Sequence, residues 1–177
     1  MDLVLSRLPS PLGELLLVTA GTAVVSLDFD DNLERLLTLL QRRMGDVVPE
    51  EGEAPDEVAR RLKRYFKGHF NALDGQRLFL AGTQFQEQVW HALREVPAGQ
   101  TASYGHLAEA LGLSAGAARA VGAANGANPV ALFVPCHRIV GADGSLTGYA
   151  GGLERKRWLL KHEGADVQGR LRQTSLF

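Results

Sequence analysis

The fold class is indicated by one stretch near the N-terminus, Leu15-Leu16-Leu17-Val18-Thr19-Ala20-Gly21-Thr22-Ala23-Val24-Val25-Ser26-Leu27. Two apolar runs, 15–18 and 23–27, flank Thr19-Ala20-Gly21-Thr22, and this pattern is typical of a β-hairpin. The run from Leu3 to Leu8 predicts a further strand. We therefore expect a small antiparallel sheet at the N-terminus, and the helical patterns that follow it make the fold class α+β.

Two helices are expected to complete an N-terminal α/β support domain over residues 1–81. Asn32 can cap the first helix, and the second follows the acidic loop 46–56. Their apolar faces are Leu33, Leu36, Leu37, Leu40 and Met44 in the first helix, and Val58, Leu62, Tyr65 and Phe66 in the second. The other side of the second helix carries Arg60, Arg61, Lys63, Arg64 and Lys67. Such a basic run more often forms a solvated helix face than a binding patch.

Residues 82–165 predict a second, mostly helical domain. Thr83-Gln84-Phe85-Gln86 has the pattern of a capping box, and Pro97-Ala98-Gly99 stops the helix that this box begins. Ser103 then caps one short helix, and Ser114 caps another. Two short helices around a tight turn that contains glycine predict a helix-turn-helix.

The second helix of this pair, over residues 115–124, is built almost entirely from alanine and glycine, and Arg119 is its only charged residue. Small side chains allow a helix to approach another surface closely. Tight packing inside the protein is the more common reason for such a composition. The alternative is a helix laid against a DNA groove, with Arg119 as its one long side chain.

Composition and charge restrict the classes of function. The 177 residues are 45% hydrophobic and 22% charged, which is typical of a globular protein. No apolar stretch approaches the length of a membrane span, and the N-terminus lacks the pattern of a signal peptide, so we expect a cytoplasmic protein. The net charge of −1 argues against strong binding to nucleic acid of any sequence. Because residues 1–81 carry a net charge of −3 and residues 82–177 a net charge of +2, a DNA partner would contact the second half.

The chain has a single cysteine, Cys136, within Val134-Pro135-Cys136-His137-Arg138. One cysteine cannot form an intramolecular disulfide and is a poor start for a zinc site, so we expect no metal. It is either an inert buried thiol or a nucleophile. A nucleophilic cysteine needs a base or a cation beside it, and His137 and Arg138 are the candidates. Since neighbouring residues of a strand point to opposite faces, His137 can act as the base only if the backbone turns here or a water bridges the two side chains.

A catalytic histidine is normally oriented by a third group, often a carboxylate. The last predicted helix, Leu153 to Glu163, places Glu163 beside its apolar stripe, with Gly164 in the capping position. A carboxylate there must be paired if it is buried, although a glutamate at a helix end is more often exposed to solvent.

Segments on both sides of Cys136 form a recognisable set. They are Asn128-Pro129, Pro135-Cys136-His137-Arg138, Gly148-Tyr149-Ala150-Gly151-Gly152-Leu153 and Lys161-His162-Glu163-Gly164, together with Ser103-Tyr104 and Ala118-Arg119-Ala120-Val121-Gly122. Together these segments resemble the O6-alkylguanine-DNA alkyltransferases, also called methylated-DNA–protein-cysteine methyltransferases. The resemblance is specific over residues 82–164, whereas over residues 1–81 it rests on size and layout.

The resemblance implies a direct and irreversible DNA repair reaction that needs no cofactor. Cys136 would take the alkyl group from O6-alkylguanine once per molecule, while Glu163, His137 and a water relay its proton away; the resemblance leaves open whether O4-alkylthymine is a second substrate. Tyr104 would protonate the guanine as it leaves, and Asn128 would brace the segment around the thiol. The partner would be double-stranded DNA, and we expect the protein to act as a monomer.

The resemblance also implies a set of DNA and substrate contacts. The alanine-rich helix would enter the minor groove, and Arg119 would fill the gap left by a nucleotide flipped out of the duplex. The other contacts that it implies are Ser103, Ala120, Val121, Gly122, Val134, Pro135, Arg138, Val140, Tyr149, Ala150 and Gly151.

Two other functions are compatible with the residues alone. The first is a helix-turn-helix module that binds alkylated DNA without repairing it, or that regulates transcription. The second is a Cys-His hydrolase with multiple turnovers, although the sequence has no evident oxyanion-hole motif.

Residues 166–177 are expected to form a flexible tail. Its last five residues, Gln173-Thr174-Ser175-Leu176-Phe177, resemble the short peptides that bind the bacterial sliding clamp. In that hypothesis Gln173 and Ser175 provide polar contacts, and Leu176 and Phe177 are the hydrophobic anchors.

Overall fold

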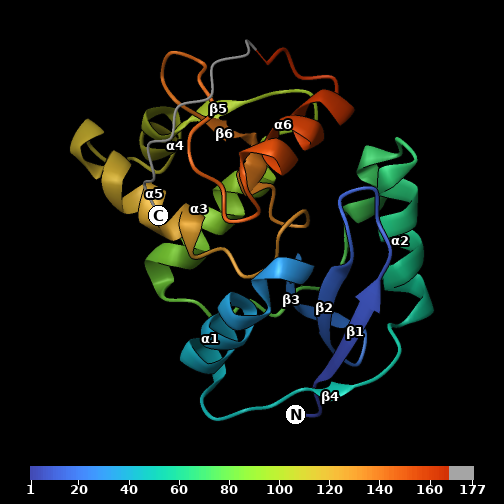
Figure 1. Ribbon diagram of the computed structural model, residues 1–177. Coiled ribbons are helices and arrows are strands. Elements are labelled where there is room, and N and C mark those ends of the chain that lie inside the picture. Colours follow the sequence, from blue (N-terminus) through green and yellow to red (C-terminus); the bar gives the residue numbers. More distant parts are fainter. Residues whose placement is uncertain (168–177) are drawn as a thin grey trace. The chain divides into compact units, whose positions relative to one another are not determined.

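The computed structural model describes residues 1–167 (Figure 1). This part of the chain divides into two compact units. The first unit consists of residues 1–81 and 129–133, and the second of residues 82–128 and the residues from 134 onward. The expected α+β class is confirmed, since the larger sheet lies in the first unit and the second unit is mostly helical.

The first unit is built on a four-stranded sheet in the order β3-β2-β1-β4. The strands are β1 (Val4–Leu8), β2 (Leu15–Ala20), β3 (Ala23–Phe29) and β4 (Glu50–Glu51). The predicted hairpin is confirmed, because β2 pairs antiparallel with β3, and β1 pairs with β2 in the same way. The sequence did not predict β4, which runs parallel to β1. Two exposed glutamates show no alternating apolar pattern, so nothing in the sequence marks this edge strand.

The core of the first unit lies between the sheet and helix α1 (Leu33–Met44). Leu16 and Val18 of β2 belong to one buried cluster with Leu36 and Leu40 of α1. Leu15 and Leu17, which alternate with them along β2, are buried as well. Because β2 is covered on both faces, its sequence is a continuous apolar run and not an alternation of apolar and polar residues.

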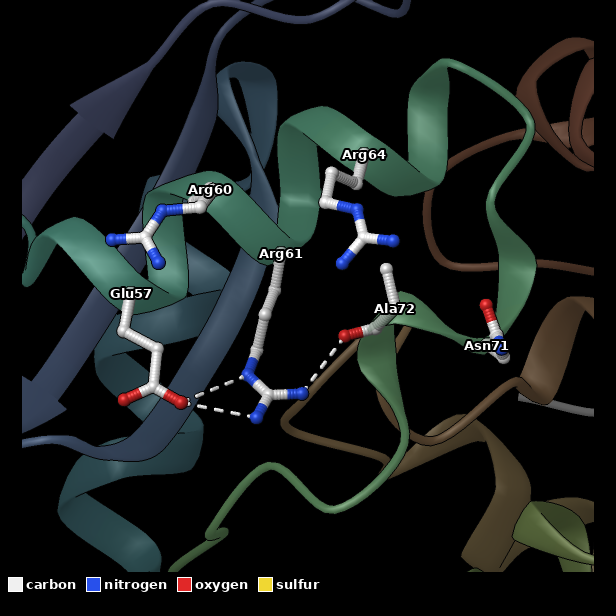
Figure 2. Close-up of a pocket in the computed structure, with 6 residues that line it drawn as sticks. All are labelled: Glu57, Arg60, Arg61, Arg64, Asn71 and Ala72. Carbon is white, nitrogen blue, oxygen red and sulfur yellow. Dashed lines mark hydrogen bonds and ion pairs between the residues drawn. The ribbon is translucent and has the colours of Figure 1, made fainter.

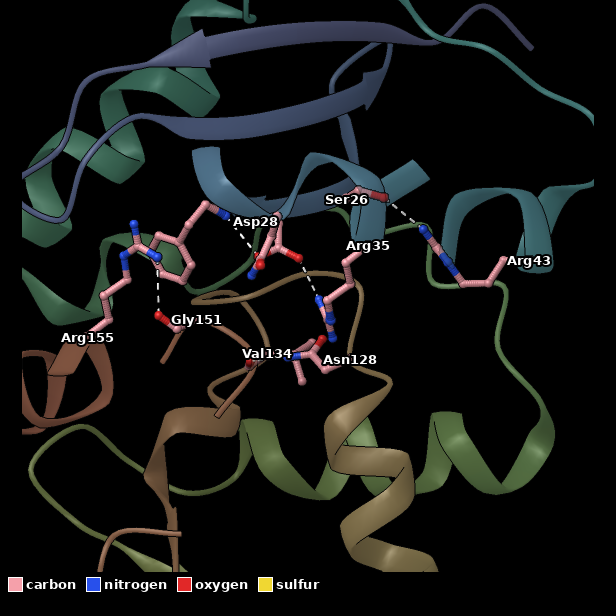
Figure 3. Close-up of polar contacts among 10 residues, drawn as sticks. Ser26, Asp28, Arg35, Arg43, Asn128, Val134, Gly151 and Arg155 are labelled. Atoms are coloured by element: carbon pink, nitrogen blue, oxygen red, sulfur yellow. Dashed lines mark hydrogen bonds and ion pairs between the residues drawn. The ribbon is translucent and has the colours of Figure 1, made fainter. Parts of the chain in front are cut away.

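The start of α1 differs from the prediction. Asn32 occupies the capping position, but its side chain makes no capping hydrogen bond. The Asn32 amide instead donates to Oδ1 of Asp28 at 2.9 Å. Asp28 also accepts a hydrogen bond from Arg35 of α1 (Figure 3). The buried Asp28 carboxylate therefore ties the end of β3 to the first turns of α1.

Helix α2 (Asp56–Phe66) and the 3₁₀ turn η2 (Phe70–Leu73) enclose a small hollow of about 230 Å³ (Figure 2). Its lining is Glu57, Arg60, Arg61, Arg64, Asn71 and Ala72. Arg61 donates to Oε1 of Glu57 at 3.0 Å and to the carbonyl oxygen of Ala72 at 3.0 Å. Arg61 is therefore a structural link between α2 and η2. Arg60 and Arg64 are exposed, as a solvated helix face requires.

The segment 129–133 corrects the expected domain boundaries. The sequence analysis placed it within a domain over residues 82–165, whereas the structure assigns it to the first unit. The reason is a pair of backbone hydrogen bonds to β3: Leu27 donates to Pro129 at 3.0 Å, and Ala131 donates to Leu27 at 3.0 Å. The chain therefore leaves the second unit after Asn128 and re-enters it at Val134, two residues before Cys136.

The described part of the second unit contains the helices α3 (Gln84–Arg94), α4 (Tyr104–Ala110), α5 (Ala118–Gly126) and α6 (Leu153–His162). Two short strands, β5 (Ala102–Ser103) and β6 (Ile139–Val140), pair in parallel. The predicted capping box of α3 is confirmed. The Ser103 cap of α4 is confirmed as well, because Ser103 Oγ accepts from the backbone N–H of His106 at 3.1 Å. No helix among residues 1–167 is both long and apolar enough to cross a membrane.

The alanine-rich segment begins differently from the prediction. A 3₁₀ turn, η3 (Ala115–Ala117), follows Ser114, and α5 starts only at Ala118 without a side-chain cap. The backbone carbonyl of Ser114 accepts from the Ala117 N–H at 2.9 Å. Ser114 thus supports a tight turn with its backbone and does not cap α5 with its hydroxyl. The indole of Trp90 in α3 donates to the carbonyl of Ala124 at 2.8 Å, which holds α5 against α3.

Candidate active site around Cys136

Cys136 lies on a 3₁₀ turn, η4 (Cys136–Arg138), and not on a strand. The Cys136 N–H donates to Val134 O at 2.8 Å, and the Arg138 N–H donates to Pro135 O at 3.0 Å. The amide of Asn128 donates to the same Val134 carbonyl at 2.8 Å (Figure 3). The backbone therefore turns at Cys136. Such a turn was one of the two conditions, beside a bridging water, under which His137 could act as the base for Cys136.

A buried network joins the two residues after Cys136 to the end of α6. Nε2 of His137 lies 2.7 Å from Oε1 of Glu163. Arg138 forms two hydrogen bonds to this carboxylate, from Nε to Oε2 and from Nη2 to Oε1, both at 2.9 Å. The side chains of His137 and Glu163 are fully buried. Glu163 is thus paired, as a buried carboxylate must be, and its position two residues beyond Lys161 places it at the C-cap of α6.

The positive φ of Gly164, 79°, explains how α6 ends at this point. Only glycine adopts this backbone conformation readily, and it allows the N–H of Ala165 to donate back to Leu160 O at 2.9 Å. The predicted glycine cap is therefore confirmed, and α6 ends immediately before it at the C-cap Glu163.

The network favours a neutral imidazole bound to an ionised carboxylate. Burial lowers the pKa of His137, although the hydrogen bond and charge of Glu163 oppose that shift. Burial alone would raise the pKa of Glu163, but the hydrogen bonds from His137 and Arg138, together with the positive charge of Arg138, outweigh it and hold that pKa well below its usual range. A neutral His137 then donates its Nε2–H to Glu163. Its Nδ1 is left as an acceptor, and this atom has no hydrogen-bond partner among residues 1–167.

A second buried polar group, which the sequence analysis identified only in part, centres on Thr147. The hydroxyl of Tyr104 lies 3.0 Å from Oγ1 of Thr147. Nζ of Lys156 donates to the carbonyl oxygen of Thr147 at 3.0 Å. Lys156 was missed, although it lies three residues before Leu159 on the apolar stripe of α6, which is the signal that could have found it. Thr147 carried no sequence signal beyond its position two residues before Tyr149.

An open hollow of about 590 Å³ lies beside Tyr104. Its lining residues are Ser103, Tyr104, Gly105, Ala118, Arg119, Gly141, Ala142, Asp143, Ser145 and Thr147. Cys136 is not among them and is 7% exposed. The hollow therefore brings together Tyr104, Thr147 and Arg119, which come from α4, the loop after β6 and α5.

The residues expected to contact DNA fall into two groups. Arg119 and Ala120 are exposed on α5, as is Ala123, and Gly116 is exposed on the preceding η3 turn. Val121 and Gly122 are buried, so they form the inner face of the same helix. The structure therefore gives α5 an outer face of small residues with one arginine.

The residues expected around the base are mostly buried near the η4 turn. Val134, Pro135, Val140 and Tyr149 are all buried, and the Tyr149 ring packs edge-on against His137 with ring centroids 6.5 Å apart. Ala150 is partly exposed. The Gly151 carbonyl accepts from Arg155 at 3.2 Å (Figure 3). Arg138 is turned inward, since its guanidinium binds Glu163 and the carbonyl of Val96.

Fold and site together define a class: an α+β protein that combines a pair of short helices, α4 and α5, with a cysteine on a turn beside a buried histidine–glutamate pair. Comparison with known proteins gives the family. Residues 84–165 match the family model described as "6-O-methylguanine DNA methyltransferase, DNA binding domain". The chain is 44% identical over 168 residues to the methylated-DNA–protein-cysteine methyltransferase of Salmonella typhimurium, covering 93% of this chain and 97% of that protein. It is 45% identical over 154 residues to the Mycobacterium leprae protein of the same name, covering 87% and 88% of the two chains.

Solved structures agree with these matches. A crystal structure of Mycobacterium tuberculosis O6-methylguanine methyltransferase superposes with a TM-score of 0.77 at 40% identity, over 92% of this chain and 93% of that one. A structure of Mycobacterium tuberculosis OGT in complex with DNA superposes with a TM-score of 0.78 at 37% identity, over 98% and 99%. The chain belongs to the methylated-DNA–protein-cysteine methyltransferase family.

Proposed function

We propose that this protein repairs double-stranded DNA by moving the alkyl group of O6-alkylguanine onto the sulfur of Cys136. The observation that carries the proposal is the fully buried His137–Glu163 pair next to Cys136 on a turn of the chain. A buried imidazole with a free acceptor nitrogen has no evident structural use there, whereas a thiol that must lose its proton needs such a base.

The transfer is a single displacement at the alkyl carbon. The sulfur forms a bond to the alkyl carbon, and the bond between that carbon and O6 of guanine breaks. The thiol proton passes through a water to Nδ1 of His137, and Glu163 stabilises the imidazolium that forms. Tyr104 donates its phenolic proton to the guanine as it leaves. Because a thioether has no easy route to hydrolysis, each molecule reacts once and no cofactor takes part.

Arg138 has a different role in this proposal from the DNA contact that the resemblance implied. Its two hydrogen bonds to Glu163 keep that carboxylate ionised and fixed in direction. A glutamate held in this way cannot take the proton from His137 permanently, so the imidazole returns to the neutral form when the proton leaves. Arg138 is thus a positioning residue for Glu163, and Asn128 holds the η4 turn through Val134.

The outer face of α5 supports binding in the minor groove. Small residues at Gly116, Ala120 and Ala123 allow close approach to the DNA backbone, and Arg119 is long enough to occupy the space of a flipped nucleotide. Flipping a base costs a few kcal/mol, and the cost is lower for a pair that alkylation has weakened. Ser103 starts α4 on the DNA side, while Val134, Pro135, Val140, Tyr149, Ala150 and Gly151 surround the base. We extend the proposal to O4-alkylthymine, to action as a monomer and to a cytoplasmic location.

Mass spectrometry with an O6-methylguanine duplex tests the proposal. We expect one methyl group per molecule, on the peptide that contains Cys136, and no second turnover with excess DNA. Cys136→Ser should abolish transfer and retain DNA binding. Binding without any transfer by the unaltered protein would instead support a binding module, and more than one product per molecule would support a hydrolase.

The sliding-clamp motif, Gln173-Thr174-Ser175-Leu176-Phe177, lies outside the described residues. We propose that it binds a bacterial clamp through Leu176 and Phe177. A peptide of residues 168–177 should bind the clamp saturably and compete with an established clamp peptide. The same peptide with Leu176 and Phe177 replaced by alanine is the control, and equal binding of the two peptides would contradict the proposal.

A further inference from the structure

Thr147 contacts two ionisable side chains, one through its hydroxyl and the other through its backbone carbonyl. Its hydroxyl lies 3.0 Å from the Tyr104 hydroxyl, and its carbonyl accepts from Lys156 Nζ at 3.0 Å. Thr147 is 7% exposed, and Lys156 is fully buried. Both contacts are therefore shielded from solvent, where a hydrogen bond to a group that changes its charge is strongest.

The chemistry of Tyr104 decides which hydroxyl donates. If Tyr104 is to give its proton to a departing guanine, its own O–H must point at the base and its oxygen must accept. The Thr147 hydroxyl is then the donor to the phenol oxygen. That bond strengthens as negative charge develops on Tyr104 during proton transfer, which is the form of electrostatic stabilisation that favours a transition state over the ground state.

The pKa of Tyr104 is consistent with the Thr147 hydroxyl as the donor. Burial raises the pKa of Tyr104, and the hydrogen bond with Thr147 opposes that shift. Without Thr147, the phenol in its buried site would be a weaker acid and would give up its proton less readily.

The carbonyl of Thr147 supports a positive charge near the thiol. Burial lowers the pKa of Lys156 to about 8, and the negative charge of Cys136 opposes this shift. A protonated Lys156 would in turn favour the thiolate form of Cys136. Thr147 thus contacts both Tyr104, the acid for the leaving group, and Lys156, a cation for the nucleophile.

We propose that Thr147 is a positioning residue of the transfer reaction, which aligns Tyr104 for proton donation through its hydroxyl and holds Lys156 in place through its carbonyl. This inference rests on the proposed function, because it concerns the acid step of that reaction. The proton leaves Tyr104 for guanine, Tyr104 becomes a phenolate that accepts from Thr147, and solvent restores the phenol after guanine has left.

The test replaces the side chain and leaves the carbonyl in place. Thr147→Val keeps the shape of threonine without its hydroxyl, so it removes the Tyr104 contact and retains the Lys156 contact. In single-turnover reactions with an O6-methylguanine duplex, we expect the maximal rate constant to fall about five- to tenfold, with the DNA concentration at half-saturation unchanged. Thr147→Ser restores the hydroxyl and should return the rate to within about twofold of the unaltered protein. Thr38→Val, at an exposed position of α1, is the matched control.

A second substrate separates positioning from general damage to the site. Iodoacetamide alkylates Cys136 and releases iodide, which needs no proton, so Thr147→Val should react with it at the rate of the unaltered protein. Thr147→Ala, which is smaller, is measured alongside as a check that does not depend on the fit of valine. In the background of Tyr104→Phe, Thr147→Val should have no further effect on methyl transfer.

The outcomes distinguish this inference from the function on which it rests. If the unaltered protein transfers no methyl group, the proposed function itself is wrong. If it transfers methyl normally and both Thr147→Val and Thr147→Ala match it, the inference is overturned. Equal slowing with iodoacetamide, or additive effects of the Tyr104 and Thr147 changes, would also overturn it, because Thr147 would then not act through Tyr104.

Discussion

Nε2 of His137 and Oε1 of Glu163 lie 2.7 Å apart, and both side chains are fully buried. The two residues come from different elements, the η4 turn and the end of α6. Because Arg138 binds the same carboxylate twice, the charge of Glu163 is fixed whether or not His137 carries a proton. In the proposed mechanism the pair therefore accepts the proton of Cys136 without a second group having to titrate.

Glu163→Gln should slow methyl transfer to Cys136 by about 10- to 100-fold, because an amide cannot stabilise the imidazolium. It should also destabilise the fold by about 3 kcal/mol, since Arg138 is left as a buried charge without its counter-ion. Single-turnover kinetics and urea denaturation measure the two effects. Glu154→Gln, at an exposed position of α6, is the control and should change neither. An unchanged transfer rate in Glu163→Gln would remove Glu163 from the mechanism.

Trp90→Phe should destabilise the second unit. The substitution leaves the carbonyl of Ala124 without its donor and opens space in a site where Trp90 is fully buried. We expect a loss of about 2–4 kcal/mol in the free energy of unfolding, measured by urea denaturation. Trp158→Phe is the matched control, because Trp158 is only partly buried on α6. Comparable losses in the two variants would contradict the role given to the Trp90 hydrogen bond.

The elements that the sequence predicted well are those with a local signal. The apolar runs of β2 and β3, the Thr83–Gln86 capping box and the Ser103 cap all depend on residues a few positions apart, and each is confirmed. β4 and the pairing of residues 129–133 with β3 depend on backbone hydrogen bonds between distant segments, which side-chain patterns do not record. Asn32 and Ser114 had the residue type of a cap, but 3₁₀ turns precede α1 and α5 and changed their roles.

The candidate site shows the same division. Cys136, His137 and Glu163 stand out by residue type, and the resemblance to the alkyltransferases predicted that the three act together. The inward turn of Arg138 was not predictable, because an arginine beside a cysteine is equally compatible with a DNA contact. Val121 and Gly122 were assigned to the DNA face, although the 3.6-residue period of a helix places them opposite Arg119 and Ala120. Packing against the rest of the second unit decides which of these two faces is buried.

Arg119→Ala should reduce methyl transfer from duplex DNA about tenfold or more, because the space of the flipped nucleotide is no longer filled. Reaction with the free base O6-benzylguanine needs no flipping and should be unchanged. The ratio of the two rate constants is the measurement. Arg60→Ala, which removes an exposed arginine of α2, changes the net charge equally and should leave both rates unaltered. Parallel losses on duplex and free base would assign Arg119 to the chemistry and not to the opening of the duplex.

Protonation of His137 should weaken the fold as the pH falls below about 6.5. Burial lowers the pKa of His137 in the folded protein, so between its ordinary value of 6.5 and that lower value the unfolded chain binds a proton that the folded protein does not. Stability therefore rises with pH across this window and is lost on acidification, with a slope of up to about 1.4 kcal/mol per pH unit for one proton. The pKa of Glu163 is also held below its ordinary 4.5, so its contribution is lost only at lower pH, and the comparison with His137→Gln between pH 5 and 7 isolates the contribution of the histidine. Urea denaturation across that range should give a steeper slope for the unaltered protein than for His137→Gln, whatever the absolute stability of the variant.

His91→Gln, at an exposed position of α3, should keep the original slope. Equal slopes for His137→Gln and the unaltered protein would mean that His137 takes up its proton in the folded state as readily as in the unfolded chain, and the neutral imidazole required for proton acceptance from Cys136 would then not be the resting form near neutral pH.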